Sequence, residues 1–443
     1  MKINYYNKKY ILDGYGISNK AIKEFFDKNN IFYTIYDDFL VKAKINISEY
    51  DYLIKSPGVP LNQKLIVDAK EQGIPVISDL ELFYLLKPNQ KYISVTGSNG
   101  KTTVTYFIHQ FLNMLNIPHH LAGNIGIPLF SIIEDVKENE LVLIECSSFM
   151  LEAVNEFSPQ VHIITNIYPH HLAHHKSFKQ YLKAKMNPLK DGKDMVCIYP
   201  SNCRLVRSEV KKRTINSYSF SNEPREGNFW INNNLVTINE KTYYLKDLEQ
   251  FNNIDQLNIL VSLGTIDVIK KFYPNLICME SIINRINSLK KYPYRQQVII
   301  DNDKLLVIND SKATNYYATY IATENLKEKH NNQHEYKILI AGGEKQDYKK
   351  NSFKFLDYFD HIILFGENKE ELGALINKYI ETDICNNLEE ALEKILKIKN
   401  RINNQKRLLI LFSPMSASHD QYKSYVERGQ HFNKLINVYQ NLF

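Results

Sequence analysis

The sequence has few cysteines and no long apolar run. Its five cysteines are scattered without a C-x-x-C pair, so neither a disulfide framework nor a cysteine-based zinc site is indicated. No stretch is apolar for long enough to span a bilayer, and the N-terminal residues lack the apolar segment of a signal peptide. We therefore expect reduced thiols and a cytoplasmic protein with no membrane insertion.

The sequence also lacks concentrated charge of one sign. The net charge of +6 is spread along the chain, and basic clusters such as residues 211–213 alternate with acidic residues. A nucleic-acid-binding protein would show a concentrated basic face, often with interleaved aromatic residues. We expect no nucleic-acid partner, and the charge suits small anionic substrates equally well.

The chain does contain short apolar strand patterns that alternate with helical patterns, which is typical of parallel sheets with crossover helices. A length of 443 residues suggests two or three domains. We expect an α/β fold with three domains. They are a Rossmann-like N-terminal domain at residues 1–90, a central P-loop ATPase-like domain at 91–292 and a C-terminal Rossmann-like domain at 293–443. Strands are predicted at residues 141–145, 161–166, 305–308, 337–341, 361–365 and 407–412, and hairpins at 229–238.

Residues 94–104 carry the most informative motif, because they follow an apolar strand pattern and open a helical one. Gly97 and Gly100 let the backbone approach a polyphosphate, and amides at the helix start supply oriented donors. Lys101 would neutralise phosphate oxygens, and the Thr102 hydroxyl can reach an accompanying Mg²⁺. The glycine spacing is tighter than in the general P-loop. A turn that binds nothing is the alternative, and the Gly-Lys-Thr-Thr helix start argues against it.

A second candidate site lies at the ends of the two following strands. Glu145 ends the strand pattern at 141–145, where nucleotide enzymes often hold Mg²⁺. We interpret it as a metal ligand rather than a solvated strand end. The strand predicted at 161–166 is followed by a turn rich in histidine, and the four imidazoles of this turn could alone suggest a transition-metal site. We rank a zinc site below a Mg²⁺ site, because the companion ligands that zinc needs are not apparent in the sequence.

Over almost the whole chain the sequence resembles the Mur ligases, and within them the branch that adds D-glutamate. The phosphate loop at 96–103 is shared by the whole superfamily, including the folylpolyglutamate synthases, so it indicates only the class. The motifs at 145–152, 309–315 and 413–422 are more specific, since sister ligases differ at the last two.

This resemblance implies an ATP-dependent ligation of D-glutamate to UDP-N-acetylmuramoyl-L-alanine through an acyl phosphate, which forms an amide bond during peptidoglycan precursor synthesis. A carboxylate and a γ-phosphate repel each other, so the site must screen charge with Mg²⁺ and cationic side chains. We expect the enzyme to be a monomer.

The resemblance also implies that the three expected domains bind the UDP substrate, ATP and the amino acid, in chain order. It further implies roles for individual residues. The catalytic set is Lys101, Glu145, His171, Lys185 and Lys312. Mg²⁺ would be held by Thr102, Glu145, His171 and Lys185, with Lys185 carbamylated so that its ammonium becomes an anion. ATP would be held by Gly97, Ser98, Asn99, Gly100, Lys101, Thr102, Thr103, Arg295 and Asp310. The other substrates would be held by Tyr15, Gly16, Ser18, Ser56, Pro57, Gly58, Asn124, Thr314, Lys345, Ser418 and Tyr425.

The sequence departs from the family pattern at three places. Residues 170–175 lack both acids of the usual Asp-His-Leu-Asp-x-His pattern. A His-Asn pair appears as Ile254-Asp255, and Tyr294 replaces a common histidine. These changes would lower ATP affinity or alter metal preference.

Two alternative functions remain open. One is a ligase of this superfamily with a different amino acid or with glutamate of the opposite hand, which the Lys312 and Ser418 loops argue against. The other is a non-catalytic nucleotide-binding subunit, motivated by the altered histidine segment. The joint presence of Lys101, Glu145, His171, Lys185 and Lys312 argues against it.

Overall fold

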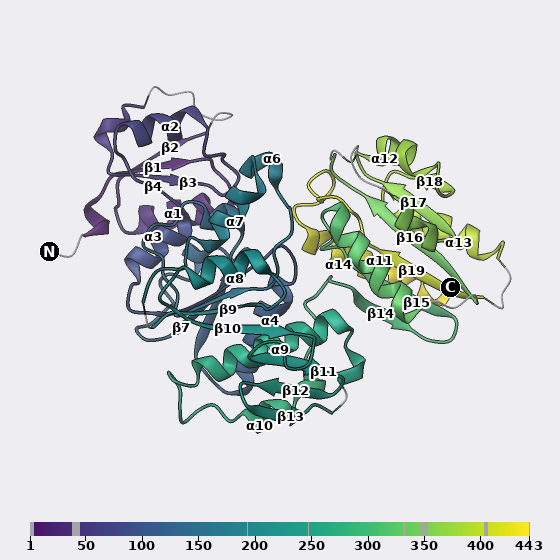
Figure 1. The fold of residues 1–443 in the computed structure, drawn as a ribbon. Helices are drawn as coiled ribbons and strands as arrows, with labels where there is room; N and C mark the ends of the chain where they lie inside the picture. The colour runs from purple at the N-terminus through teal and green to yellow at the C-terminus, as the bar shows by residue number, and fades with distance from the viewer. Residues whose placement is uncertain are drawn as a thin grey trace. The chain divides into compact units, whose positions relative to one another are not determined.

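The structure is a computed structural model that describes residues 4–37, 45–192, 194–246, 248–330, 334–345, 348, 353–402 and 406–442. The chain forms two compact units, Met1–Lys290 and Lys291–Phe443. In Figure 1 the first unit runs from purple to green and the second from green to yellow. No helix among the described residues combines the length and apolarity that crossing a membrane requires.

The first unit begins with a small parallel sheet in the order β2-β1-β3-β4. Its strands are β1 (Tyr10–Asp13), β2 (Tyr33–Tyr36), β3 (Tyr52–Lys55) and β4 (Val76–Ile77), and its helices are α1 (Ile17–Lys28), α2 (Lys64–Glu71) and α3 (Asp79–Leu86). Because the strands are parallel, the loops that follow β1 and β3 lie at the same edge of the sheet.

The second sheet of this unit has the order β13-β12-β11-β10-β9-β8-β5-β7-β6. Its strands are β5 (Lys91–Thr96), β6 (His119–Gly123), β7 (Leu141–Glu145), β8 (Val161–Ile164), β9 (Val196–Pro200), β10 (Asn216–Ser221), β11 (Phe229–Asn232), β12 (Leu235–Ile238) and β13 (Lys241–Tyr244). Its helices are α4 (Lys101–Met114), α5 (Ser148–Leu151), α6 (Leu172–His175), α7 (Phe178–Met186), α8 (Arg204–Lys211), α9 (Asn253–Ile269) and α10 (Met279–Ile283). The parallel strand β5 lies between β7 and β8, so the loops after these three strands are neighbours.

The two sheets of the first unit are joined by a shared apolar core. On one face of the large sheet, α4 and α9 pack against alternate residues of its strands. On the other face, Tyr92 of β5 packs with Phe83 of α3 and with Phe157, in the same core as Tyr10 of the small sheet. This continuous core explains why residues 1–290 form one compact unit.

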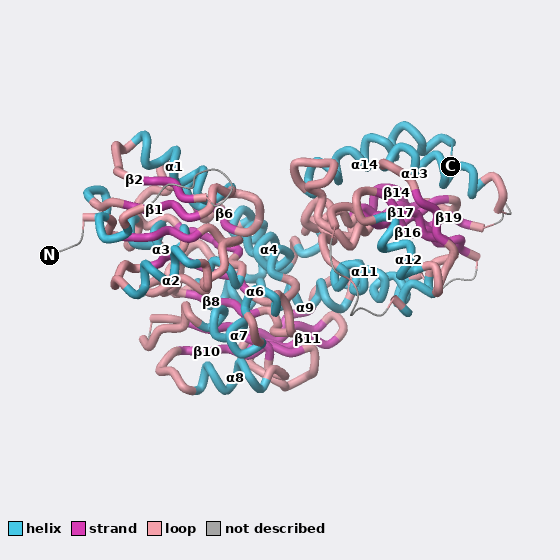
Figure 2. The backbone as a smooth tube through the Cα atoms, turned by 90° about the horizontal axis from the view of Figure 1, so that it is seen from above, coloured by secondary structure: helices cyan, strands magenta, loops and turns pink. Residues whose placement is uncertain are grey.

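The second unit contains one sheet in the order β14-β15-β19-β16-β17-β18, in which only β14 is antiparallel to its neighbour. Its strands are β14 (Gln297–Asp301), β15 (Leu305–Asn309), β16 (Glu335–Gly342), β17 (His361–Phe365), β18 (Thr382–Ile384) and β19 (Arg407–Phe412). Its helices are α11 (Tyr316–Lys329), α12 (Lys369–Ile376), α13 (Leu388–Lys399) and α14 (Tyr425–Tyr439). Figure 2 shows α11 and α12 on one side of the sheet and α13 and α14 on the other, each pair packing on its own core.

The predicted α/β class with parallel sheets is confirmed, and so are the six predicted strands and the antiparallel pairing of β11 with β12. The strand predicted at 161–166 ends two residues earlier, at Ile164. The division into three domains, with boundaries at residues 90 and 292, stays a prediction. The described residues form three sheets, two of which share the core of the first unit.

Candidate active site

The phosphate loop follows β5 and requires glycine at two positions. Gly97 has a φ of 149°, and a Cβ atom there would lie 1.9 Å from the Thr165 Oγ1 atom. Gly100 has a φ of 79° and is the N-cap residue of α4. Both backbone conformations are unfavourable for residues with a side chain, so the sequence pattern and the loop geometry agree.

The loop is fixed by the segment that follows β8. The Asn99 amide donates to Asn166 Oδ1 at 2.8 Å, and Asn166 Nδ2 donates back to the Asn99 carbonyl at 3.1 Å. The Ser98 amide donates to the Asn166 carbonyl at 2.9 Å. The Ser98 hydroxyl lies 2.8 Å from the Tyr181 hydroxyl, which comes from α7. Sequence reasoning missed Asn166 and Tyr181, because no local spacing links them to the loop.

Two lysines meet at the carbonyl group of Gly97. Lys101 Nζ donates to the Gly97 carbonyl at 2.9 Å and to the Ser98 carbonyl at 3.0 Å. Lys185 Nζ donates to the same Gly97 carbonyl at 2.9 Å and to Thr96 Oγ1 at 3.0 Å. The Lys185 side chain is buried, and burial together with the charge of Lys101 holds its pKa well below the usual value. The neutral form of the amine is therefore far more populated at Lys185 than at a surface lysine.

A buried serine–histidine pair contacts the backbone of Lys185. His162 Nε2 lies 2.9 Å from the Lys185 carbonyl oxygen, and His162 Nδ1 lies 2.6 Å from the Ser94 hydroxyl. Burial lowers the pKa of His162 to about 4, so the imidazole is neutral and carries one N–H group. That proton belongs on Nε2, where the carbonyl can only accept, and Ser94 then donates to Nδ1.

Glu145 ends β7 beside β6 and is buried. Its Oε1 atom accepts a hydrogen bond from Asn124 Nδ2 at 2.9 Å, and the Asn124 amide donates to the Glu145 carbonyl at 2.8 Å. The charge of Glu145 also raises the pKa of Lys185, against the larger effect of burial. The structure thus brings the predicted residues Asn124, Glu145 and Lys185 into one neighbourhood.

His171 lies in the turn before α6, with a φ of 52°. Its ring centroid is 4.7 Å from that of Phe149. His171 is an exposed residue, and desolvation by its surroundings together with the positive charges of neighbours, including Lys101 and Lys185, lowers its pKa. A neutral imidazole is the form that can ligate a metal.

The predicted substrate loops of the small sheet lie side by side. The Ser56 amide donates to the Asp13 carbonyl at 2.8 Å, and the Ser56 hydroxyl donates to the Gly14 carbonyl at 3.4 Å. Gly16 is the N-cap residue of α1, which begins at Ile17. These contacts bring the loop at residues 14–18 against the loop at 56–58.

In the second unit, Lys312 is held between aromatic rings. Its Nζ atom lies 4.7 Å from the ring centroid of Tyr292 and 5.2 Å from that of Tyr425. The Thr314 amide donates to the Lys312 carbonyl at 2.8 Å. The predicted residues Lys312, Thr314 and Tyr425 are therefore neighbours.

Other predicted residues of the second unit have separate surroundings. Asp310 is buried, with Oδ2 accepting from the Ser413 hydroxyl at 2.8 Å, and burial raises its pKa to about 7 against the opposing charge of Arg295. Ser418 is buried, and its carbonyl accepts from the Tyr422 amide at 2.8 Å. The Lys345 side chain is exposed and lies 3.6 Å from Glu371.

Arg428 organises the loops of this unit and was missed from the sequence. It is fully buried in the first turns of α14. Its guanidinium donates to the carbonyl of Ser311 at 2.8 Å, to that of Ser416 at 3.0 Å and to that of Ala417 at 3.1 Å. It therefore ties the loop after β15 to the loop after β19. A single arginine in a helical pattern gives no signal of this role.

The chain has relatives along almost its whole length. The Mur ligase middle domain matches residues 95–263. UDP-N-acetylmuramoylalanine–D-glutamate ligase of Natranaerobius thermophilus is 32% identical over 88% of this chain and 84% of the relative. The enzyme of the same name from Clostridium tetani is 27% identical over 97% of both chains.

Solved structures share the fold. UDP-N-acetylmuramate–alanine ligase of Thermotoga maritima superposes with a TM-score of 0.59 at 18% identity, covering 98% of this chain and 100% of that one. The MurF ligase of Thermotoga maritima in complex with ADP gives a TM-score of 0.58 at 16% identity, covering 98% of this chain and 96% of that one. At these identities the likeness concerns the fold alone.

Proposed function

The chain belongs to the Mur ligase family, and we propose from this membership that it is an ATP-dependent ligase that joins D-glutamate to UDP-N-acetylmuramoyl-L-alanine. The proposal rests on one observation: residues that the family resemblance predicts for the active site lie near the ends of β5, β7 and β8. There the phosphate loop, the buried Lys185 and the buried Glu145 occupy one edge of the sheet. The division into domains at 1–90, 91–292 and 293–443 is part of this proposal, with one substrate assigned to each domain.

The first step is phosphoryl transfer to the carboxylate of the alanyl substrate. A carboxylate oxygen attacks the γ-phosphorus of ATP, the bond to the β-phosphate oxygen breaks, and ADP leaves with that electron pair. We assign Lys101 and the loop amides to the phosphates, since a lysine that now bonds the Gly97 carbonyl can turn to a phosphate oxygen. Asp310 and Arg295 are assigned to the nucleotide.

The second step is attack by the D-glutamate amine on the acyl phosphate. The amine must arrive unprotonated, because only its lone pair forms the new C–N bond. The bond between the carbonyl carbon and the phosphate oxygen then breaks, phosphate leaves with that electron pair, and the nitrogen loses one proton to give the amide. We assign Lys312, Thr314 and Tyr425 to the glutamate carboxylates, with Lys345 and Ser418 in the same region. The positive charge of Lys312, which lies over the rings of Tyr292 and Tyr425, suits a dicarboxylate.

Mg²⁺ fits the side chains of this edge, and when bound it would screen the negative charges of ATP and the carboxylate. We assign Thr102, Glu145, His171 and Lys185 as its ligands. Glu145 supplies a carboxylate and His171 a neutral imidazole. An ammonium cannot ligate a cation, so Lys185 must lose its positive charge.

Burial of Lys185 supports its carbamylation. An amine adds CO₂ only in its unprotonated form, and the lowered pKa makes that form available. Addition of CO₂ forms an N–C bond, releases one proton and leaves a carbamate anion. This anion supplies the oxygen ligand that the ammonium cannot.

The nucleotide-sugar substrate is assigned to the small sheet. The loops at 14–18 and 56–58, which include Tyr15, Gly16, Ser18, Ser56, Pro57 and Gly58, would hold its UDP end, and Asn124 would hold the muramoyl-alanine end. The proposal has the enzyme act as a monomer in the cytoplasm, where ATP and UDP-linked sugars are available.

Phosphate release tests this function directly. The purified chain is supplied with ATP, Mg²⁺ and UDP-N-acetylmuramoyl-L-alanine, and D-glutamate, L-glutamate or no amino acid is added. Release that requires D-glutamate and matches amide product supports the proposal. Dependence on another amino acid would keep the ligase class and change the substrate, and nucleotide binding without release would favour a non-catalytic subunit.

A further inference from the structure

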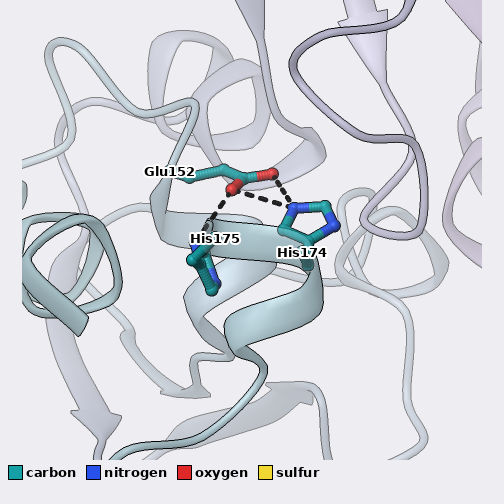
Figure 3. Close-up of side chains that lie close together, drawn as sticks. All are labelled: Glu152, His174 and His175. Carbon is teal, nitrogen blue, oxygen red and sulfur yellow. Dashed lines mark hydrogen bonds and ion pairs between the residues drawn. The ribbon is translucent and has the colours of Figure 1, made fainter. Parts of the chain in front are cut away.

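Three side chains of the first unit direct their ligand atoms at one another. Glu152 follows α5, and His174 and His175 are the last two residues of α6. His174 Nε2 lies 2.9 Å and 3.0 Å from the two oxygens of Glu152, and His175 Nδ1 lies 3.4 Å from Glu152 Oε2. One ligand atom from each residue lies within 4.8 Å of the other two (Figure 3).

We propose that Glu152, His174 and His175 bind a divalent transition-metal ion of the zinc class. A tetrahedral zinc ion with bonds of about 2.0–2.1 Å holds its donor atoms about 3.3 Å apart. The separations of 3.0 Å and 3.4 Å from Glu152 Oε2 to the two imidazoles are close to this value. Two imidazole nitrogens and a carboxylate oxygen are a donor set that zinc, cobalt and nickel accept.

In the sequence, no companion ligand for zinc was apparent near the histidine-rich segment. We assign that role to Glu152. It lies more than twenty residues before His174, and the packing of α6 against Ser148 and Phe149 of α5 brings the two together. His170 and His171 do not belong to the three-residue group. The site therefore uses none of the residues assigned to Mg²⁺.

The surroundings of the three ligands suit a bound ion. His175 Nε2 lies 2.9 Å from the Ser148 hydroxyl, a contact that orients the ring and leaves Nδ1 for the metal. The side chains of Glu152 and His175 are 5% and 3% exposed, whereas His174 is 14% exposed. A metal ion can thus enter beside His174 and be largely shielded from water.

The nearest charge is the buried ammonium of Lys55, which comes from β3 of the small sheet. Lys55 Nζ lies 2.8 Å from Glu152 Oε1. The ammonium repels a metal ion, but it contacts Oε1 and leaves Oε2 of Glu152 to bind the ion. The negative charges of Asp79 and Asp13 also act on Lys55.

Cobalt binding tests the site without any need for turnover. The full-length chain is treated with a chelator, freed of it and titrated with Co²⁺, whose tetrahedral complexes absorb visible light. We expect one such Co²⁺ per chain, displaced by Zn²⁺. His174→Gln should weaken binding by at least about tenfold, and so should Glu152→Gln. His174 is partly exposed, so its variant should stay folded, which thermal unfolding followed by circular dichroism checks.

Two matched variants separate this site from others. Glu145→Gln removes the carboxylate proposed for Mg²⁺ and keeps all three ligands, and His120→Gln removes an imidazole that contacts Glu140 elsewhere in the unit. Both should bind Co²⁺ like the original chain. The inference is overturned if the original chain shows no tetrahedral absorption, if binding survives both ligand variants, or if it disappears in Glu145→Gln.

Discussion

The Nζ atom of Lys185 lies 2.9 Å from the Gly97 carbonyl oxygen, so a buried amine is in contact with the first glycine of the phosphate loop. Burial lowers the pKa of this lysine and prepares it for reaction with CO₂. We predict that Lys185→Ala lowers kcat by roughly 100-fold or more, because an oxygen ligand is lost.

A short carboxylic acid such as acetate should partly restore the activity of Lys185→Ala, since it can occupy the space of the carbamate. Lys185→Arg should stay inactive under the same conditions, because its cation fills that space. Steady-state rates with increasing acetate provide the measurement. Equal rates with and without acetate would contradict a carbamate at this position.

Lys101→Ala tests the phosphate loop itself. The substitution removes a cation assigned to the phosphates, so we expect kcat to fall by roughly 10³-fold. The fold should survive, because Asn166 and Tyr181 also hold the loop when the contacts of Lys101 are lost. Lys179→Ala, at an exposed position of α7, is the matched control. Turnover close to that of the control would rule out the role of Lys101.

Lys312→Ala should impair the use of D-glutamate and leave binding of the UDP substrate intact. Loss of one charge-assisted hydrogen bond costs about 1.5–3 kcal/mol, so KM for D-glutamate should rise about tenfold or more. Tyr425→Phe keeps the ring beneath Lys312 and should have a smaller effect. The prediction fails if Lys312→Ala shows unchanged glutamate kinetics in an assay that also reports UDP-substrate binding.

Asp310 should make the free energy of unfolding of the second unit depend on pH. Its pKa is about 7 in the folded protein against 3.8 for an ordinary aspartate, so the folded state binds the proton more tightly. The free energy of unfolding should therefore fall as the pH rises from about 4 to about 7, by at most about 4 kcal/mol. Urea unfolding across this range, compared with Asp310→Asn, measures it. A variant with the same pH slope would show that another group is responsible.

Arg428→Met should loosen the second unit. The guanidinium satisfies carbonyls of two loops, and its removal leaves buried acceptors without donors. We expect a loss of about 3 kcal/mol in the free energy of unfolding. Because Arg428 fixes the loop that carries Lys312, KM for D-glutamate should rise as well. Ser424→Ala, which removes only the N-cap of the same helix, should cost about 1 kcal/mol.

Local sequence patterns were sufficient to predict the strands and the phosphate loop, because apolar runs and glycine spacing are properties of neighbouring residues. It was not sufficient for Lys185, which looks like any helical lysine until the burial of α7 is known. Asn166, Glu152 and Arg428 act through contacts between distant segments, and no spacing in the sequence encodes such contacts. The resemblance to the family supplied Lys185, and only the structure supplied the other three.

The acyl phosphate is the central claim, and transfer of a heavy-oxygen label tests it most directly. UDP-N-acetylmuramoyl-L-alanine labelled in its free carboxylate is incubated with ATP, Mg²⁺, D-glutamate and the purified chain, and the released phosphate is analysed by mass spectrometry. We predict that one labelled oxygen passes from the carboxylate to phosphate for each amide formed. Amide formation that leaves the phosphate unlabelled would contradict the acyl phosphate, and an absence of D-glutamate-dependent amide would contradict the proposed function.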